Sequence, residues 1–456
     1  HLFIQYFKVT KILGISAFYH DSAAAIIIDG KIIAAAQEER FTRKKHDATY
    51  PFNAIEFVLD FSKLKLHQVD YIVFYEKPFL KFERLLETYV AFAPKGFKSF
   101  CMSIPLWLKE KLFQKKLIFN QLKKHDKNFD DINKIHFSEH HLSHAASAFY
   151  PSPFKEALIL TADGVGEWGT TTVAIGKENE LEILKEIHFP HSLGLLYTAF
   201  TYYTGFKVNS GEYKLMGLAP YGEPKYKNLI LDNLIDVKED GSFQLDQAYF
   251  EYSTGLKMIS ERFSKLFGKN PRNPEKEKLT PFHMDIASSI QSVTEEVMLR
   301  LTNSLAKEYK MENLCLAGGV ALNCVANGKI LRNGKFKNIW IQPAAGDAGG
   351  AIGAALGLWH IELKKDRIIN SNDGMHGSYL GPEYSQQEIE RKLKKIGANF
   401  KTLEEDKLIE KTSSALTEGK AIGWFQGRME FGPRALGARS IIADSRSETM
   451  QKKLNL

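Results

Sequence analysis

A similar order of expected strands and loops occurs twice in this chain, and this repetition constrains the fold most. In residues 11–36 an apolar strand leads into a loop with Asp21, then a small-residue strand, a hairpin turn and a third strand. Residues 157–187 follow the same order, with Asp163 in the corresponding loop. Such a duplication predicts a two-lobed molecule whose aspartate loops face one shared cleft. The alternative is two unrelated three-strand units.

The composition is typical of a globular protein and argues against several classes. With 456 residues, 44% hydrophobic, the chain can form two or three domains with a large core. No apolar run approaches the about 18 residues of a membrane span, and residues 1–10 show no signal-peptide pattern. The three cysteines form no CxxC pair, which is typical of a reducing compartment. We therefore expect a cytoplasmic protein without a membrane span.

The net charge of +7 comes largely from lysines between residues 95 and 127. A solvated helical face explains such a run better than nucleic acid does, although a phosphate-rich small substrate would also suit it. We therefore expect no nucleic-acid partner.

Two histidines four residues apart are the first candidate metal ligands. Ser138 is expected to cap a helix that continues to Tyr150. On that helix His140 and His144 share one face, whereas His141 points about 100° away. The pair can bind one metal ion but needs a third ligand from elsewhere in the chain. Without such a ligand, the pair is an ordinary polar helix face.

Glycines further along the chain are typical of nucleotide-binding turns. Residues 313–317 predict a strand that leads into Gly318 and Gly319 and then a helix over residues 320–331. A nucleotide could approach the backbone there, at the positive end of the helix. A glycine pair is equally common in packing turns. Asp347 lies near the start of a second helix rich in glycine and alanine, where it could be an ordinary N-cap.

The composition changes after about residue 361. Residues 366–384 are rich in Asn, Asp, Gly and Pro and predict a linker, and a new α/β pattern begins at about residue 385. Four arginines in this last part are spaced among glycines: Arg428, Arg434, Arg439 and Arg446. Such a loop can bind phosphate or carboxylate groups. Surface charge is the alternative explanation.

Six stretches together resemble the NodU/CmcH carbamoyltransferase family, which includes O-carbamoyltransferases of antibiotic and nodulation-factor biosynthesis. They are GISAFYHDSAAA at residues 14–25, AQEERFTRKKH at 36–46, HHLSHAASAF at 140–149, GEYKLMG at 211–217, LAGGVALN at 316–323 and FGPRALGARS at 431–440. The resemblance implies an α/β fold with a duplicated actin-like ATPase domain (Kae1/TsaD-like) over residues 11–365. It also implies a linker over 366–384 and the N-terminal part of a YrdC-like carbamoyladenylate-forming domain over 385–456. Family members continue further, so the YrdC-like site is expected to be incomplete here.

The same resemblance implies an ATP-dependent enzyme. Such enzymes join carbamoyl phosphate and ATP into carbamoyladenylate, and then pass the carbamoyl group to a hydroxyl of a small-molecule or glycan acceptor. The family's metal ligands fall on His140, His144 and Asp347. Two histidines and one carboxylate with open positions suit Fe(II), with Zn(II) as the alternative and Mg(II) as a further candidate. A homodimer is also compatible with the sequence.

The remaining expected site residues form three groups. The glycine loops of the two lobes should line one nucleotide cleft through Asp163, Gly164, Gly166, Gly318, Gly319 and Asn323. The four arginines should bind carbamoyl phosphate and ATP. In the transfer step His20 is expected to act as general base, Asp21 to orient the acceptor and Lys214 to steady phosphate or carbonyl charge. If His20 and Asp21 only satisfy backbone groups of a tight turn, the base lies elsewhere.

Three other functions share part of this pattern. A threonylcarbamoyl transferase acting on tRNA would have the histidine helix but not the arginine-rich C-terminal unit. An actin-like sugar kinase would need no paired histidines. A nucleotide-binding module or chaperone would need no transfer chemistry. Metal analysis separates the two carbamoyl-transferring enzymes from the other candidates.

Overall fold

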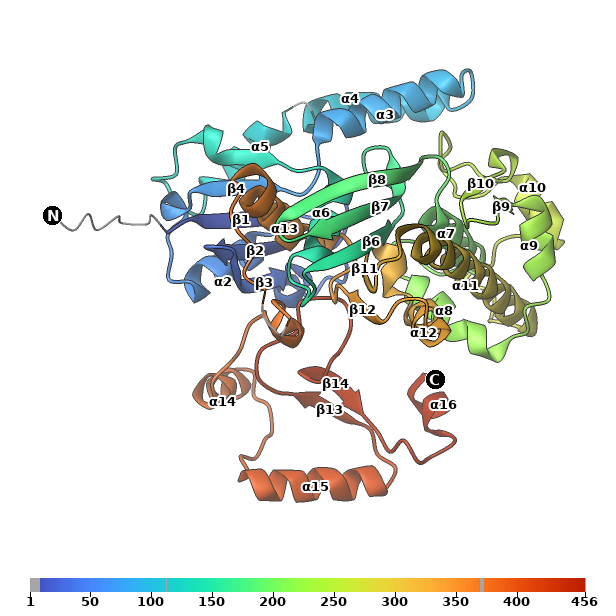
Figure 1. Cartoon of the computed structure of the whole chain (residues 1–456). Coiled ribbons are helices and arrows are strands. Elements are labelled where there is room, and N and C mark those ends of the chain that lie inside the picture. Colours follow the sequence, from blue (N-terminus) through green and yellow to red (C-terminus); the bar gives the residue numbers. More distant parts are fainter. Residues whose placement is uncertain (1–8, 112, 370–372, 456) are drawn as a thin grey trace. The chain divides into compact units, whose positions relative to one another are not determined.

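The structure is a computed structural model that describes residues 9–111, 113–369 and 373–455 (Figure 1). The first eight residues, where no signal peptide is expected, and residues 370–372 of the expected linker lie outside the described residues. The described residues form two compact units, one that ends at Gly374 and one that begins at Met375. The domain boundaries drawn from the sequence remain a prediction.

The first lobe contains a five-stranded mixed sheet in the order β3-β2-β1-β4-β5. Its strands are β1 (Lys11–Ser16), β2 (Ala23–Ile28), β3 (Lys31–Gln37), β4 (Tyr71–Phe74) and β5 (Ile135–Phe137). β1 pairs antiparallel with β2 and parallel with β4, and β4 pairs parallel with β5. β1 and β2 are buried along almost their whole length, which explains their continuous apolar sequence. Helix α2 (Phe52–Phe61) contacts β2 and β3, and α1 (Glu39–Thr42) precedes it.

The second lobe repeats this sheet strand for strand. Its strands are β6 (Glu156–Ala162), β7 (Gly169–Lys177), β8 (Glu180–His188), β11 (Asn313–Ala317) and β12 (Asn338–Ile341), in the order β12-β11-β6-β7-β8. β6 to β8 form the antiparallel part, and β11 pairs parallel with both β6 and β12. The loops after β1 and β6 both have six residues, and they bear His20 and Asp163 respectively. The predicted duplicated α/β fold is therefore confirmed.

Two equivalent helices, one from each half of the duplication, pack against each other (Figure 1). They are α6 (His140–Phe149), which follows β5, and α13 (Asp347–Gly357), which follows β12. α6 contacts β6 and β11 of the second sheet, whereas α13 contacts β1 and β2 of the first. A Cβ on Gly353 would lie 1.7 Å from the carbonyl oxygen of Ser143, so glycine lets the two backbones touch. Because each helix packs on the sheet of the other half, the starts of α6 and α13 lie next to each other.

The start of α6 is stabilised differently from the sequence-based expectation. Ser138 does not cap the helix, because the N-cap position is Glu139 and no side chain of its own caps it. Instead, the carboxylate of Glu167 accepts the backbone N–H of His140 at 3.0 Å. The expectation was wrong because the capping group comes from the loop after β6, which local sequence cannot show.

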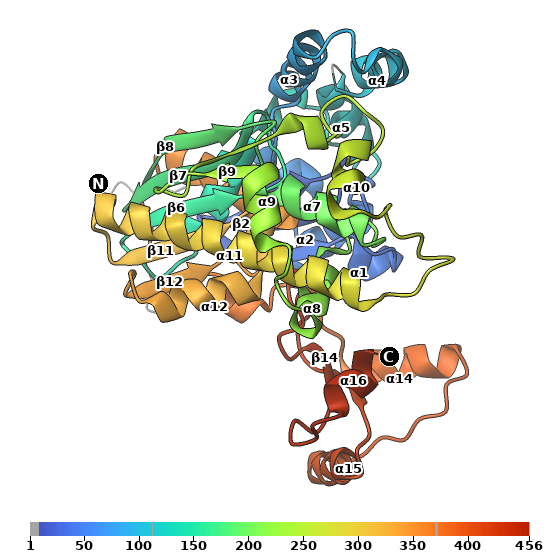
Figure 2. The ribbon, with the colours of Figure 1, turned by 90° about the vertical axis from the view of Figure 1, so that its right-hand side faces the viewer.

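Residues 189–312 build the helical part of the second lobe. The elements are α7 (Leu193–Tyr203), α8 (Glu212–Leu218), α9 (Lys227–Asn233), β9 (Ile235–Val237), β10 (Phe243–Leu245), α10 (Glu261–Phe267) and α11 (Pro281–Tyr309). α11 contacts α7, α8 and α9, and also α12 (Cys324–Asn333), as Figure 2 shows. Phe200, Phe263 and Ile290 are fully buried in the core of this part. The stretch over residues 223–280, which has no clear pattern in the sequence, thus contributes to packing.

Between β4 and β5 the chain adds three helices, which are α3 (Pro78–Ala91), α4 (Phe97–Lys111) and α5 (Gln114–Leu122). α4 contacts both α3 and α5. These helices bear most of the lysines that the sequence concentrates between residues 95 and 127. In the part of the chain that the structure describes, no helix is long and apolar enough to cross a membrane.

The second unit contains a hairpin and three helices. Its elements are α14 (Gln386–Lys395), α15 (Glu405–Thr417), β13 (Ile422–Phe425), β14 (Arg439–Ile442) and α16 (Met450–Asn455). Ser378 belongs to this unit, because its hydroxyl donates to the carbonyl oxygen of Phe431 at 2.6 Å and its own carbonyl accepts from the Phe431 N–H at 2.7 Å. Arg367 belongs to the first unit, where its guanidinium binds the carbonyl oxygen of Phe149 at the end of α6, at 2.7 Å. The two ends of the expected linker are thus each anchored.

Candidate metal centre

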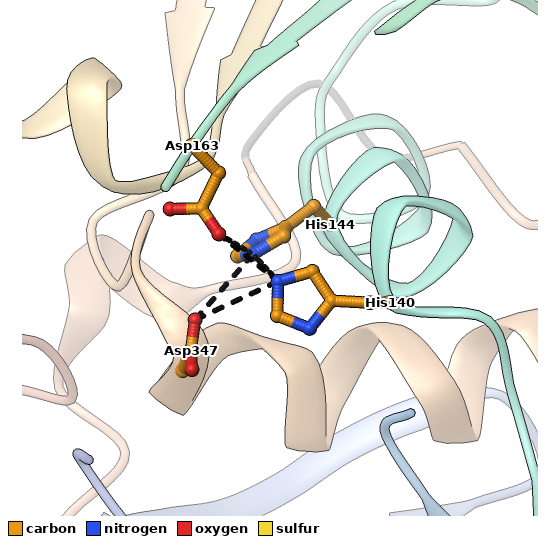
Figure 3. A group of neighbouring side chains, drawn as sticks. All are labelled: His140, His144, Asp163 and Asp347. Carbon is orange, nitrogen blue, oxygen red and sulfur yellow. Dashed lines mark hydrogen bonds and ion pairs between the residues drawn. The ribbon is translucent and has the colours of Figure 1, made fainter. Parts of the chain in front are cut away.

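Four buried side chains converge at the contact between the lobes: His140, His144, Asp163 and Asp347 (Figure 3). The histidines lie one turn apart on α6, and Asp163 directly follows β6. Asp347 is the first residue of α13 rather than its N-cap, which is Gly346. The ordinary capping role that the sequence left open is therefore excluded. The structure brings the three predicted ligands together and adds Asp163.

The distances between the donor atoms fit a metal coordination polyhedron. Nε2 of His140 lies 3.1 Å from Nε2 of His144 and 3.0 Å from Oδ2 of Asp163. Nε2 of His144 lies 3.5 Å from the same Oδ2, and both Nε2 atoms lie 3.7 Å from Oδ1 of Asp347. Tetrahedral bonds of about 2.0–2.2 Å separate neighbouring ligand atoms by about 3.4 Å. The two nitrogens and two oxygens therefore fit one small divalent cation.

The charges of these groups also suit a cation. Burial raises the pKa of Asp163, but hydrogen bonds and positive charge at His140 and His144 outweigh it and hold the pKa well below its usual range. Burial likewise raises the pKa of Asp347, and the charge of His20 with the hydrogen bond to His144 more than offsets it. Both carboxylates are therefore anionic at neutral pH, as metal ligands must be.

The two carboxylates in turn favour a positive charge on a neighbouring histidine. Burial lowers the pKa of His144, but Asp163 and Asp347 outweigh burial and raise it to about 9. Without a bound cation, the His144 imidazole is therefore protonated at neutral pH. The Nδ1 atoms of His140 and His144 are buried and have no hydrogen-bond partner among the described residues. This differs from the usual arrangement, in which the second ring nitrogen of a metal-binding histidine is hydrogen-bonded.

Neighbouring groups position the carboxylates. The hydroxyl of Tyr75, at the end of β4, donates to Oδ2 of Asp347 at 3.2 Å. The backbone N–H of Gly319 donates to Oδ1 of Asp163 at 2.9 Å. Because each bond uses the oxygen that faces away from the histidines, Oδ1 of Asp347 and Oδ2 of Asp163 remain directed at them (Figure 3).

His141 lies apart from the four, in agreement with its expected direction. Its Nδ1 lies 2.8 Å from the hydroxyl of Thr161. Burial and the neighbouring histidines hold the pKa of His141 well below its ordinary value, so this imidazole is neutral. It therefore serves the packing of α6 on β6.

The predicted transfer residues lie at different distances from the centre. Nε2 of His20 is 3.7 Å from Oδ2 of Asp347, and its Nδ1 is 3.0 Å from Oδ2 of Asp21. The other oxygen of Asp21 lies 2.6 Å from Nδ1 of His46. Lys214 is exposed on α8, and among the described residues its ammonium group has no hydrogen-bond partner. The loop after β1 thus reaches the centre, and Asp21 links two imidazoles.

The predicted nucleotide loops also meet, through Asp163 and Gly319. Gly318 has a φ of +86° and donates its N–H to the carbonyl of Ala345 at 2.8 Å. Gly166 is buried, and a Cβ there would lie 3.0 Å from Cβ of His140. The close approach of these glycines therefore serves packing around the centre. Gly164 is only half-buried. A nucleotide role for these residues stays a prediction.

Asn323 has partners of its own. Its Oδ1 accepts the N–H of Ala326 at 3.1 Å and so caps α12, which begins at Cys324 after a 3₁₀ turn (Gly319–Leu322). The expected helix start at residue 320 was therefore four residues too early. The amide of Asn323 also exchanges two hydrogen bonds with Gln291, at 2.9 and 3.0 Å. A contact with a ribose or base would require these bonds to rearrange.

The arginines of the second unit have mixed surroundings. Nε of Arg439 donates to the buried carboxylate of Glu430 at 2.8 Å, and Nε of Arg428 donates to the carbonyl of Gly381 at 3.2 Å. Arg446 is exposed and pairs with Asp444 at 2.9 Å. Arg434 is partly exposed. Phosphate binding by these arginines stays a prediction.

Sequence reasoning did not assign Asp163 to the metal group, and it missed Tyr75, Glu167 and His46. The sequence analysis places Asp163 in a loop, but it does not show that this loop lies next to α6. The duplication contained a usable signal, because equivalent elements of the two halves must meet at the contact between lobes. Tyr75 and Glu167 act through hydrogen bonds across 272 and 27 residues, which leave no local pattern.

The fold and the site together define a class, namely a duplicated α/β protein with a buried His/Asp group at the contact of its lobes. The chain belongs to the carbamoyltransferase family. Residues 11–356 match the carbamoyltransferase N-terminus and residues 413–456 match the carbamoyltransferase C-terminus. The predicted family and enzyme class are thereby confirmed.

Individual relatives agree with this assignment. The chain is 60% identical to the uncharacterized protein sll1178 of Synechocystis sp. over 98% of this chain and 73% of that protein. It is 34% identical to nodulation protein NolNO of Sinorhizobium fredii over 96% of this chain and 60% of that protein. It is 31% identical to the 3'-hydroxymethylcephem-O-carbamoyltransferase of Streptomyces clavuligerus over 31% of this chain and 22% of that enzyme. The chain thus spans 73% and 60% of the length of the first two relatives.

Proposed function

We propose that this protein is an O-carbamoyltransferase. The carbamoyl group would come from carbamoyl phosphate and ATP as carbamoyladenylate, and would pass to a hydroxyl of a small-molecule or glycan acceptor. The observation that carries the proposal is the convergence of His140, His144, Asp163 and Asp347 beside His20. Membership of the carbamoyltransferase family supports the transfer, and the name of the Streptomyces relative supports oxygen as the acceptor atom.

The four ligands would hold a divalent cation. Two imidazoles and two carboxylates suit Fe(II) or Zn(II) better than Mg(II), which prefers oxygen ligands. When bound, the ion would supply Lewis acidity and a template for the phosphate of the adenylate. The remaining tasks fall to residues of the chain.

His20 is placed to take a proton. If its Nδ1–H donates to Asp21, the lone pair of Nε2 faces the centre. Nε2 would accept the acceptor's hydroxyl proton while the acceptor oxygen bonds to the carbamoyl carbon. The bond from that carbon to the phosphate oxygen then breaks and AMP leaves, which balances the step.

The protonation of His20 depends on the neighbouring carboxylates. Burial lowers its pKa, but the charge of Asp347 and the hydrogen bond and charge of Asp21 outweigh burial and raise it to about 9. A general base must be neutral before it accepts a proton. A cation bound to Asp347 would offset that carboxylate and bring the pKa of His20 closer to neutrality.

The test is carbamoyl transfer by the full-length protein. The protein is loaded with Fe(II) or Zn(II) and incubated with carbamoyl phosphate, ATP and a panel of hydroxylated acceptors. We expect mass spectrometry to show the gain of one carbamoyl group on an acceptor. His140→Ala should lose both metal and product, whereas His188→Ala, at an exposed histidine paired with Glu186, should keep both. Metal-loaded protein that hydrolyses ATP but carbamoylates nothing would instead be a nucleotide-binding module.

A further inference from the structure

The most buried positions of helix α3 hold mainly polar and charged residues. Its buried residues are Pro78, Lys81, Arg84 and Thr88, whereas Phe79 and Val90 are 61% and 77% exposed. Lysine and arginine are almost never fully buried unless they are paired. An inward cationic face on a surface helix therefore indicates a role for these side chains inside the lobe.

Arg84 is buried on this helix, and its surroundings do not satisfy all of its hydrogen-bond donors. Its side chain lies on the ring of Phe189, with the guanidinium carbon 4.9 Å from the ring centroid. The residue is only 4% exposed, and its Nε and Nη1 are buried without a hydrogen-bond partner among the described residues. Burial lowers the pKa of Arg84 to about 10, which reflects the missing partners. A buried, incompletely paired guanidinium is costly and needs an explanation.

Nearby carboxylates do not supply the missing hydrogen bonds. Glu76 and Glu167 are close enough to influence the pKa of Arg84. However, Glu76 pairs with Lys81, with Oε2 2.6 Å from Nζ. Glu167 accepts the N–H of Lys77 at 2.7 Å and that of His140 at 3.0 Å. The two carboxylates offset the charge of Arg84 from a distance and leave its Nε and Nη1 without a hydrogen-bond partner among the described residues.

The surroundings of Arg84 border the candidate metal centre. Glu167 holds the first residue of α6, which is the ligand His140. Tyr19, which also influences the pKa of Arg84, precedes His20, and their rings lie 4.5 Å apart. Nζ of Lys81 lies 5.0 Å from the centroid of the Tyr19 ring. A group bound at Arg84 would therefore lie on the His20 side of the centre.

We propose that Arg84 binds an oxyanion of a substrate, a carboxylate or a phosphate, in a subsite beside the metal centre. The planar guanidinium matches both groups in a two-pronged contact, and Lys81 would add positive charge. This inference rests on the proposed function, because it treats the centre as the place of transfer. Two sources share the chemistry, namely the phosphate of the carbamoyl donor and an acidic group of the acceptor.

The test is equilibrium binding, which needs no turnover. Calorimetry on the full-length, metal-loaded protein measures the Kd for inorganic phosphate in the wild type and in Arg84→Met and Arg84→Lys. Arg262→Met is the matched control, because Arg262 also stacks on an aromatic ring, that of Tyr249 at 4.8 Å, but is exposed. We expect Kd to rise about 10- to 100-fold in both Arg84 variants, the loss of a hydrogen bond to a charged group. The control should bind as the wild type does.

Each result decides the proposal. If Arg84→Met folds and binds phosphate as the wild type does, the proposal is wrong. If Arg84→Met does not fold, unchanged phosphate binding by Arg84→Lys likewise overturns the proposal. Competition then assigns the source in the wild type. Displacement of phosphate by carbamoyl phosphate or AMP assigns the donor, and displacement by glycerate or glycerol phosphate, but not glycerol, assigns an acidic acceptor. Displacement by none of these overturns the substrate role. Because the metal content of each variant is measured separately, failure here is distinguishable from failure of the proposed function.

Discussion

The contact between α6 and α13 allows a sharp test of how the fold builds the centre. A Cβ at position 353 would lie 1.7 Å from the carbonyl oxygen of Ser143 and 2.9 Å from the backbone N of Ser147. Both atoms belong to helix backbone and cannot turn away. For Gly353→Ala the helices must separate by about 1.3 Å before the new methyl clears the oxygen, since packed interiors have little free space. Such overpacking costs about 1–3 kcal/mol.

The same displacement should damage the metal site. His140 and His144 are on α6 and Asp347 is on α13, with 3.7 Å between Nε2 and Oδ1. A separation of the helices by about 1 Å exceeds the about 0.5 Å tolerance of a preorganised site. We therefore expect Gly353→Ala to lower metal affinity by at least about 10-fold and to reduce the stability of the protein.

Gly357→Ala is the matched control, because position 357 lies one turn later on the same helix. A Cβ there would make an ordinary contact, 3.9 Å from Cβ of Ala146. Replacing a helical glycine by alanine should then stabilise the protein by about 0.5–1 kcal/mol. Metal content by elemental analysis and thermal unfolding of both variants give the comparison. Wild-type metal content and stability in Gly353→Ala would refute the argument that this contact sets the ligand spacing.

Four further substitutions test the centre and the second unit. Asp163→Asn should lower metal affinity by more than about 100-fold, because even residues that only hydrogen-bond to metal ligands contribute about 10–100-fold to affinity. If the wild type and Asp163→Asn bind equal amounts of metal, Asp163 is not a ligand. In chelator-treated protein, the raised pKa of His144 stabilises the fold fully below its unfolded value of 6.5, and this contribution is lost as pH rises through about 9. Thermal unfolding should therefore show falling stability over that range in the wild type and a flatter profile in His144→Ala. His20→Asn should keep carbamoyladenylate synthesis and lose transfer by about two to four orders of magnitude, whereas equal loss of both half-reactions would make His20 structural. Arg439→Lys should abolish adenylate formation in the full-length protein, because lysine cannot make the two-pronged contact; the Glu430 pair makes correct folding of this variant a necessary control.

The sequence determined the elements and their duplication. Strands and hairpins appear in the chain as apolar runs and turn residues, which depend on neighbours a few positions away. β11 (Asn313–Ala317) has the bounds that the sequence predicts. The i, i+4 spacing of His140 and His144 likewise follows from helix geometry alone. The third ligand, Asp347, came from family resemblance, because no local pattern relates it to α6.

Only the tertiary structure decided what meets at the centre. α6 packs on the second sheet and α13 on the first, so the ligand atoms of four residues from three segments, namely α6, the loop after β6 and α13, lie within 4.8 Å of one another. Asp163 thereby lies with the histidines rather than only along a nucleotide cleft, and Glu167 replaces Ser138 as the partner of the α6 start. The physical reason is that the backbone contact through Gly353 fixes how closely α6 and α13 approach, and this distance depends on packing across the whole fold.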